Sequence, residues 1–332
     1  MKNNFPYTLD NKRYHTYNYF LKKKYHTKVA KVALNADFTC PNRDGSKGVG
    51  GCSFCSSMGA GEYAGNVNDD LMKQFNDQKE IMRRKWPHCQ FIPYFQAFTN
   101  TYAPIETLKQ RFEPFLHLED CVGLAIATRA DCITEEIAQY LGTLNKETDI
   151  YIELGLQSIH DETSKIINRC EDFETFKKGL SLLRKYGLEV CVHIINGLPY
   201  ETHEMMLETA IEVGKLDIQA IKIHSLYIMK NTALYLQYMN KPFPLLSRDD
   251  YISLVVEQLR HIPSHVVVER LTGDAMIGQL FEPQWSIRKT TILNDIDKDF
   301  LLETVDRPTF RDLFFKNAKD EALITYFKNL LK

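Results

Sequence analysis

Six short apolar stretches of the chain alternate with longer stretches that have helical periodicity. The short stretches have the length and the residue content of strands, and they cover residues 31–38, 91–98, 121–128, 149–158, 189–197 and 220–228. The clearest helical patterns lie between them, at residues 68–85, 133–144, 173–187 and 203–216. This alternation predicts a parallel sheet with helices on its outside.

The last three predicted strands carry polar side chains on one face only. Their branched apolar residues recur at every second position, which leaves the polar residues together on the opposite face. These polar positions include Glu153 and Gln157, Cys191 and His193, and Lys222 and His224. A parallel strand buried between two layers of helices should be apolar on both faces. The pattern therefore predicts an α/β fold: a partial, TIM-like (βα)6 barrel, with parallel strands and outer helices, whose interior holds a polar ligand.

We divide the chain into three parts: a basic and aromatic N-terminal segment (residues 1–28), the barrel (29–240), and a C-terminal strand and helix extension that closes the barrel (241–332). The extension carries one more strand pattern, "VVVERL", and ends in an amphipathic helical pattern at residues 309–332. Between them lie Arg270, Asp274, Trp285, Arg288 and Lys289. Two interpretations stay open for these residues: contact with a polyanionic substrate, or a cap that stabilises the barrel.

Composition adds the cellular setting. The 332 residues are 44% hydrophobic and carry a formal net charge of −2, so the chain can bury a large core and is not a polycation. No apolar run is long enough to span a membrane, and the N-terminus lacks the apolar core of a signal peptide. We therefore expect a cytoplasmic protein without a membrane partner. Its eight cysteines then indicate metal or redox chemistry wherever they cluster, since the cytosol keeps thiols reduced.

Charge is uneven along the chain. Residues 1–31 hold eight Lys or Arg residues and one acidic residue, interleaved with tyrosines and a phenylalanine. Cations for phosphates beside rings for bases are what an RNA contact surface needs. An amphipathic helix that packs its aromatics on the domain and leaves its lysines in water would show the same pattern. The two interpretations are compatible.

A glycine-rich loop follows the first predicted strand and contains three of the eight cysteines. In "TCPNRDGSKGVGGCSFC", eleven residues separate Cys40 from Cys52, and two separate Cys52 from Cys55. Loops at the carboxyl ends of barrel strands build active sites. Three thiolates without a fourth suit a four-iron, four-sulfur cluster that leaves one iron open to a ligand from outside the protein.

These residues resemble the radical S-adenosylmethionine superfamily. The similarity is to the branch that includes YhcC and YtqA, and more distantly to the radical subunit of Elongator. Most members have three and two residues between the cysteines, whereas this chain has eleven and two. The phrases that carry the resemblance are "FTCPNRDG", "GGCSFC", "YFQAFTNTYAP", "ELGLQS", "HIINGLPYET", "RLTGD" and "PQWSIRK". They extend over nearly the whole chain.

The resemblance implies two cofactors, a four-iron, four-sulfur cluster and S-adenosylmethionine. Cys40, Cys52 and Cys55 would bind the cluster, and Phe54 would pack near the adenine of S-adenosylmethionine. Arg169 matches an arginine that pairs with the methionine carboxylate, a group that a guanidinium recognises well.

Further cofactor contacts are implied along the barrel strands. Three residues after the second strand would meet the amino group of the methionine moiety: Gln96, Thr99 and Asn100. Glu153 and Gln157 match a polar pair on the fourth strand, with Gln157 near the ribose. His193 could contact ribose, relay a proton or be a satisfied barrel histidine, so it and its neighbour Cys191 are the catalytic candidates.

The implied activity is reductive cleavage of S-adenosylmethionine to a 5′-deoxyadenosyl radical, with the electron supplied by an external flavodoxin- or ferredoxin-like donor. Similarity to Elongator points to tRNA as the partner. The expected reaction is conversion of 5-carboxymethylaminomethyluridine to 5-aminomethyluridine at the wobble position. Two alternatives stay open: a radical enzyme that acts on a small metabolite or a peptide, and a non-catalytic iron–sulfur or zinc scaffold that binds RNA.

Overall fold

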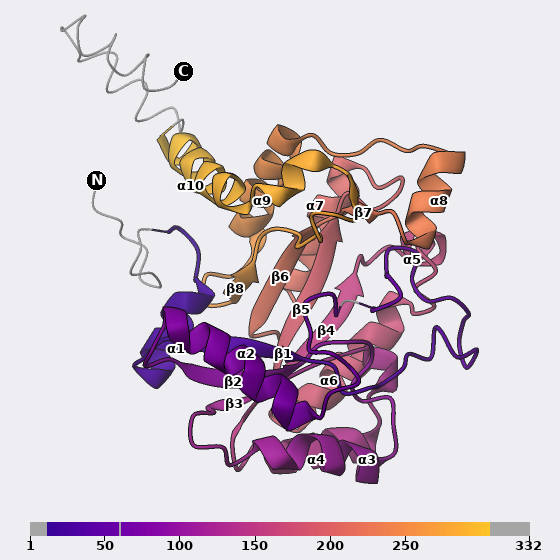
Figure 1. Ribbon diagram of the computed structural model, residues 1–332. Coiled ribbons are helices and arrows are strands. Elements are labelled where there is room, and N and C mark those ends of the chain that lie inside the picture. The colour runs from indigo at the N-terminus through magenta and orange to yellow at the C-terminus, as the bar shows by residue number, and fades with distance from the viewer. Residues whose placement is uncertain (1–11, 60, 306–332) are drawn as a thin grey trace, which may run out of the picture.

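Seven parallel strands form one curled sheet in a computed structural model that describes residues 12–59 and 61–305 (Figure 1). The strands are β1 (Val29–Leu34), β2 (Gln90–Phe95), β3 (Gly123–Thr128), β4 (Asp149–Gln157), β5 (Glu189–Asn196), β6 (Ala220–Ser225) and β8 (Val267–Arg270). Their order in the sheet follows the chain, so β1 and β8 form its two edges. The sheet is a partial barrel that stays open between these edges, as the sequence predicts.

Helices connect the strands and cover the outer face of the sheet (Figure 1). They are α2 (Leu71–Lys85), α3 (Ile105–Phe112), α4 (Glu135–Leu144), α5 (Asp161–Ile166), α6 (Phe173–Lys185), α7 (His203–Gly214) and α9 (Arg248–His261). Most begin at a side chain that accepts hydrogen bonds from the first turn: Asp70, Thr134, Asp172, Thr202 and Ser247. The four predicted helices are all confirmed, whereas α3, α5 and α9 were not among them.

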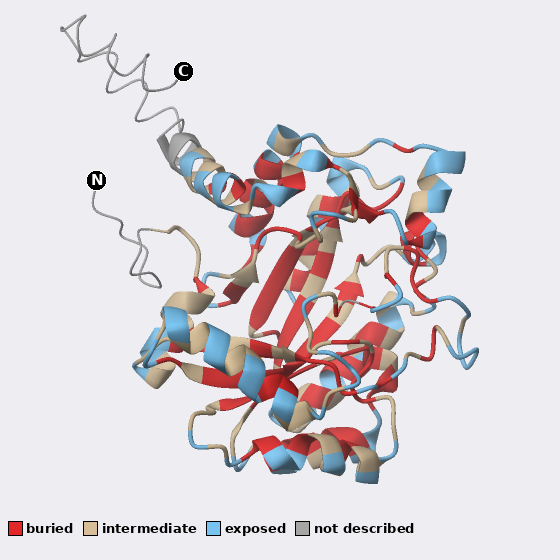
Figure 2. Ribbon diagram, viewed as in Figure 1, coloured by how far each residue is buried: buried red, intermediate tan, exposed pale blue. Residues whose placement is uncertain are grey.

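The two faces of the sheet differ as predicted. Ile152 and Leu154 of β4, Val192 of β5 and Ile223 of β6 are buried in the core that the sheet forms with the outer helices. Figure 2 shows the strands as the most deeply buried elements. The polar side chains of the same strands point the other way, into the barrel, where they can build a site.

The C-terminal extension continues the sheet, because β8 pairs in parallel with β6. The remaining elements are β7 (Ile228–Met229), α8 (Ala233–Asn240), β9 (Leu280–Glu282) and α10 (Lys289–Val305). β7 and β9 form a small antiparallel pair. Trp285 packs against the core and donates its indole N–H to the carbonyl of Leu246 at 3.0 Å, as a stabilising cap would. Arg270 and Asp274 instead line the barrel interior.

Helix α1 (Tyr17–Tyr25) closes the amino end of the barrel. Its apolar and aromatic side chains pack against the inner residues of the sheet: Tyr17, Phe20, Leu21 and Tyr25. Lys24 pairs with Asp149, at the start of β4, over 2.8 Å. The amphipathic-helix interpretation of the N-terminal segment is therefore confirmed for these residues. Lys22 and Lys23 are exposed and remain open to contact with RNA.

Two parts of the predictions lie outside the described residues: the first eleven residues of the N-terminal segment and the final helix at 309–332. Within the described part of the chain, no helix combines the length and the apolar character that crossing a bilayer requires.

Candidate active site

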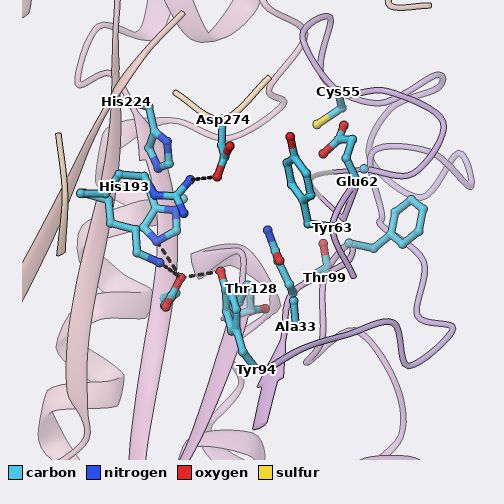
Figure 3. A pocket seen from close by; sticks show the side chains of 18 of the residues that line it. Ala33, Cys55, Glu62, Tyr63, Tyr94, Thr99, Thr128, His193, His224 and Asp274 are labelled. Atoms are coloured by element: carbon cyan, nitrogen blue, oxygen red, sulfur yellow. Dashed lines mark hydrogen bonds and ion pairs between the residues drawn. The ribbon is translucent and has the colours of Figure 1, made fainter. Parts of the chain in front are cut away.

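The interior of the partial barrel holds a cavity of about 500 Å³ (Figure 3). It extends from α1, at the amino ends of the strands, to the cysteine loop at their carboxyl ends. The strands contribute Lys31 and Ala33 (β1), Tyr94 (β2), Thr128 (β3), Glu153 and Gln157 (β4), His193 (β5), Lys222 and His224 (β6) and Arg270 (β8). Five of the six polar positions assigned above to one face of the strands, all except Cys191, therefore meet around one space.

All three clustered cysteines line this cavity. Cys40, Cys52 and Cys55 lie in the loop that follows β1, and Figure 3 shows Cys55 at one end of the cavity, beside Glu62. The structure therefore brings together the three residues that are predicted to bind a cluster.

The cysteine loop is held by hydrogen bonds to the segment after α5. The side-chain amide of Asn168 donates to the carbonyl of Gly51 at 2.8 Å, and the Ser53 N–H donates to the carbonyl of Ile167 at 2.8 Å. Gly51 has a φ of +81°, a conformation that favours glycine. The loop thus has a defined shape that comes from its own contacts.

Asn42 occupies the centre of the loop. Its amide donates to the carbonyl of Asn168 and lies 3.6 Å from the sulfur of Cys52. Gly48 packs so closely that a Cβ there would lie 2.1 Å from the Asn42 side-chain oxygen. Position 48 therefore requires glycine, because the Asn42 side chain lies too close for a Cβ. The Asn42 amide in turn orients the sulfur of Cys52.

The surroundings of Cys52 favour a thiolate. A hydrogen bond from Cys55 lowers the pKa of Cys52 to about 5, and the guanidinium groups of Arg169 and Arg129 act in the same direction while burial opposes them. Thiolate is the form that ligates metal. The donor set therefore fits a metal group bound at these sulfurs.

Three thiols in one loop are the donor set that a four-iron, four-sulfur cluster with one open iron would use, because such a cluster takes its thiolates on different irons. All three come from the loop after β1 and border the same cavity. Among the described residues, no three His, Cys, Asp or Glu side chains are placed to hold a single metal ion.

The residues after β2 separate into two groups. Gln96 and Thr99 line the cavity, where the predicted cofactor contact would be made. Asn100 is buried outside the cavity lining, and its amide donates to the carbonyls of Phe95, Ala97 and Ala127 at 2.9–3.1 Å. The side-chain oxygen of Asn100 has no hydrogen-bond partner within the described residues, so its predicted contact with the cofactor stays a prediction.

Arg169 offers an unfilled donor beside the cysteines. It is buried, pairs with Glu171 at 2.7 Å and donates to the carbonyl of Gly155. Its Nε has no hydrogen-bond partner within the described residues. A buried guanidinium with an unsatisfied N–H fits a carboxylate ligand. Phe54 and Gln157 line the same cavity, Gln157 at a bulge between β4 and β5.

Protein groups at the cavity floor surround the carboxylate of Glu153, which is predicted to contact the cofactor. Lys31 lies 2.5 Å from one oxygen, while Lys222, His193 at 3.0 Å and the Tyr94 hydroxyl at 2.5 Å share the other. Burial raises the pKa of Glu153, but Lys222 and Lys31 outweigh it and hold the pKa well below 4.5. Glu153 is thus a buried carboxylate whose contacts connect the side chains of four strands at the cavity floor.

Lys31, Tyr94 and Glu269 belong to this floor, and the sequence reasoning missed all three as site residues. Glu269 pairs with Lys31 at 2.7 Å. A charged residue inside the apolar patterns "VAKVAL" and "VVVERL" is the signal that could have identified two of them.

His193 lines the cavity, and its ring centre lies 5.3 Å from that of His224 (Figure 3). Burial lowers the pKa of both histidines, and Lys222 acts in the same direction on each. Both rings are therefore uncharged near neutral pH. His193 keeps its candidacy as a proton relay or substrate contact.

Cys191 shares a strand face with His193 but lies closer to the amino end of the barrel. It borders a separate cavity of about 200 Å³, lined also by Tyr17 and Phe20 of α1. Burial raises the pKa of its thiol well above 9.0, so the thiolate needed for nucleophilic chemistry is disfavoured. The structure therefore separates Cys191 from the candidate site.

The sequence profile of the Radical SAM superfamily matches residues 46–213, and that of the Radical_SAM C-terminal domain matches residues 218–301. A profile described as ribose-5-phosphate isomerase matches residues 289–330. The chain is 47% identical to YtqA of Bacillus subtilis (strain 168), over 98% of this chain and 100% of that protein. It is 31% identical to YhcC of Escherichia coli (strain K12), over 84% of this chain and 89% of that protein.

More distant similarity connects the chain to proteins named for tRNA. It is 29% identical to the tRNA uridine(34) acetyltransferase of Methanocaldococcus infernus, over 61% of this chain and 34% of that protein. The solved structure of the archaeal Elp3 of that organism superposes with a TM-score of 0.62, over 82% of this chain and 63% of the other, at 19% identity. Identity at that level shows a shared fold.

Proposed function

The chain belongs to the radical S-adenosylmethionine superfamily, and from this premise we propose that it is a tRNA-modifying radical enzyme. Its proposed reaction removes the carboxymethyl group of 5-carboxymethylaminomethyluridine at the wobble position and leaves 5-aminomethyluridine. After abstraction of a hydrogen atom from the carbon between amine and carboxylate, loss of a second electron to the oxidised cluster would give an imine, and its hydrolysis would release the two carbons as glyoxylate. The observation that carries the substrate assignment is the similarity to proteins named tRNA uridine(34) acetyltransferase.

Cys40, Cys52 and Cys55 would hold the four-iron, four-sulfur cluster, since they line one cavity from one loop. The unfilled Nε of Arg169 would bind the methionine carboxylate of S-adenosylmethionine. We assign contacts with the rest of that cofactor to the other predicted residues that line the cavity: Phe54, Gln96, Thr99 and Gln157. Reductive cleavage of S-adenosylmethionine at such a cluster supplies a 5′-deoxyadenosyl radical that abstracts hydrogen from carbon.

The residues of the chain would position the substrate and exclude water. The floor formed by Lys31, Glu153 and Lys222 lies toward α1, and the proposed entry of the base is from the cysteine-loop end. The proposed substrate is one extruded base that enters the barrel interior beside S-adenosylmethionine, because enzymes that modify a base take it out of the stack. The carbon between the amine and the carboxylate is a favourable place to abstract hydrogen.

An external flavodoxin- or ferredoxin-like protein is the proposed reductant, because radical S-adenosylmethionine enzymes need an electron from outside. We place the reaction in the cytoplasm, where tRNA and such donors occur together.

Mass spectrometry of nucleosides from total tRNA tests the proposal directly. Cells that lack the gene should accumulate 5-carboxymethylaminomethyluridine and lose 5-aminomethyluridine with the products made from it. A plasmid copy of the gene should restore the profile, whereas a copy with Cys52→Ala should not. An unchanged profile in cells that normally express the gene would exclude this substrate and favour a metabolite or a peptide.

A further inference from the structure

Arg270 is a cation that its neighbours only partly neutralise. Its side chain is 38% exposed and lines the cavity at the end of β8. Its one ion pair among the described residues is with Asp274, and the Nη1–Oδ2 distance is a long 3.5 Å. Asp274 also makes a much closer ion pair with Lys289, so its charge is shared. The remaining N–H donors of Arg270 have no partner within the described ranges and are available to a ligand.

The cations at the cavity floor are not available in this way. Lys31 contacts Glu153 and Glu269, and Lys222 contacts the same two carboxylates, Glu153 closely and Glu269 at 3.6 Å. Two lysines thus face two glutamates, and their charges cancel within the protein. An anionic ligand would meet little net positive charge there.

His224 adds a donor beside Arg270. It lies on the same side of the cavity as Asp274, and neither of its ring nitrogens has a hydrogen-bond partner in the described part of the chain (Figure 3). An uncharged imidazole keeps one N–H, which can donate to an oxyanion. Arg270 is close enough to act on the pKa of His224. Arg270 and His224 together give one wall of the cavity a positive charge and a neutral hydrogen-bond donor.

We infer that Arg270 and His224 form a subsite that binds the carboxylate of the substrate side chain. The inference rests on the proposed function, in which the substrate is an N-substituted glycine attached to a base. A guanidinium binds a carboxylate with two parallel hydrogen bonds, which fixes its orientation as well as its position. The subsite would hold the carbon to be attacked at a fixed place relative to the cysteine loop.

The same wall suits the amine of such a side chain. Glu62 and Asp274 border the space together with Tyr63 and Tyr227. A secondary amine is protonated near neutral pH and would be attracted by these carboxylates. An oxyanion of the RNA backbone offers Arg270 the same chemistry, but it carries no adjacent cation and lies outside the extruded base.

Binding of two anticodon stem-loops to the anaerobically reconstituted holoenzyme tests the subsite. The RNAs differ only at the wobble base, which is 5-carboxymethylaminomethyluridine in one and 5-aminomethyluridine in the other. Wild-type protein should prefer the acid. Arg270→Gln should weaken binding of the acid about 10- to 100-fold, as loss of a charge-assisted hydrogen bond does, and leave binding of the amine within about twofold.

Two further variants complete the test. Arg270→Lys keeps the charge without the bidentate geometry and should lose less affinity for the acid than Arg270→Gln. Arg84→Gln is the matched control, because Arg84 is exposed on α2 and does not line the cavity, so both affinities should stay at the wild-type level. Thermal unfolding of each variant checks that the fold is intact.

The outcomes separate the subsite from the reaction. If Arg270→Gln loses its preference for the acid while wild-type protein fails to convert it, the subsite stands and the proposed reaction is wrong. If wild-type protein converts the acid but Arg270→Gln keeps the preference, the subsite is wrong and the reaction stands. Equal weakening of both RNAs would place Arg270 on a phosphate and overturn the inference, as would a wild-type protein without a preference.

Discussion

Glu153 illustrates how a single buried carboxylate can organise the floor of an active site. It is 1% exposed and contacts groups from β1, β2, β5 and β6. A buried charge of this kind depends on its partners, and its partners depend on it. Removing the charge would leave Lys31 and Lys222 with one carboxylate, Glu269, between them.

We expect Glu153→Gln to lower the free energy of unfolding by about 3–5 kcal/mol, the usual result of breaking a buried ion pair. Chemical denaturation at neutral pH measures this difference. Glu135→Gln is the control, because Glu135 lies on the surface and its contact with Lys185 is screened by water. A decrease in unfolding free energy no larger than that of the control would mean that the stability of the floor does not depend on this charge.

The stabilisation by Glu153 should depend on pH. Its folded pKa lies well below the ordinary value of 4.5, so its contribution is complete above pH 4.5 and is lost as the pH falls toward the folded pKa. The difference in unfolding free energy between wild type and Glu153→Gln should therefore shrink in acid. A difference that stays constant below pH 4.5 would show that the carboxylate is not charged in the folded protein.

Cys52 is the cysteine whose environment most favours a thiolate, so replacing it should lower the amount of metal that the protein binds. We expect Cys52→Ala to lose most of the bound iron and sulfide after anaerobic reconstitution, and to form no 5′-deoxyadenosine with dithionite. Cys89→Ala should behave like wild type, because Cys89 is buried in the core behind β1 and β2. Full iron content in Cys52→Ala would overturn the cluster assignment.

At the scale of elements, α1 is a short helix that depends on the barrel. Nine residues are too few for a stable isolated helix in water, so packing must hold it. Its inner side chains and Lys24 supply that packing at the amino ends of the strands. The cysteine loop lies at the opposite ends, so a base that enters beside this loop, as proposed, would approach the protein far from α1.

This arrangement changes what is expected of the basic N-terminal segment. Replacing both exposed lysines, Lys22→Glu and Lys23→Glu, should leave the affinity for tRNA and its salt dependence within about twofold, because phosphates near the cavity mouth would not reach α1. Fluorescence anisotropy over a series of salt concentrations gives both quantities. A large loss of affinity with a shallower salt slope would instead place RNA on α1.

At the scale of the whole molecule, we expect the fold to be independent of the proposed cluster. The cysteine loop is fixed by Asn42, Asn168 and Ser53, and the core lies on the other face of the sheet. Removal of the cluster by oxidation and chelation should lower the midpoint of thermal unfolding by only a few degrees. Circular dichroism of matched holo and apo samples measures this shift. Loss of the cooperative transition would show that the cluster helps to hold the barrel.

The sequence alone determined the strands, their order of appearance and the face on which each polar residue lies. Periodicity is a local property, and a side chain at every second position faces the same way whatever the partner strand is. The spacing of Cys40, Cys52 and Cys55 was equally local, since one loop carries all three. These features were therefore predictable, and the structure confirms that the residues meet around one cavity.

Tertiary structure alone decided which polar residues touch one another and how deep each lies. Glu153 and Lys31 are 122 positions apart, and Lys31 and Glu269 are 238 apart, so no local pattern pairs them. Their contact depends on the register of neighbouring strands and on the curl of the sheet. For the same reason Cys191 and His193 share a face yet border different cavities, because height along the barrel axis, which a two-residue period does not report, separates them.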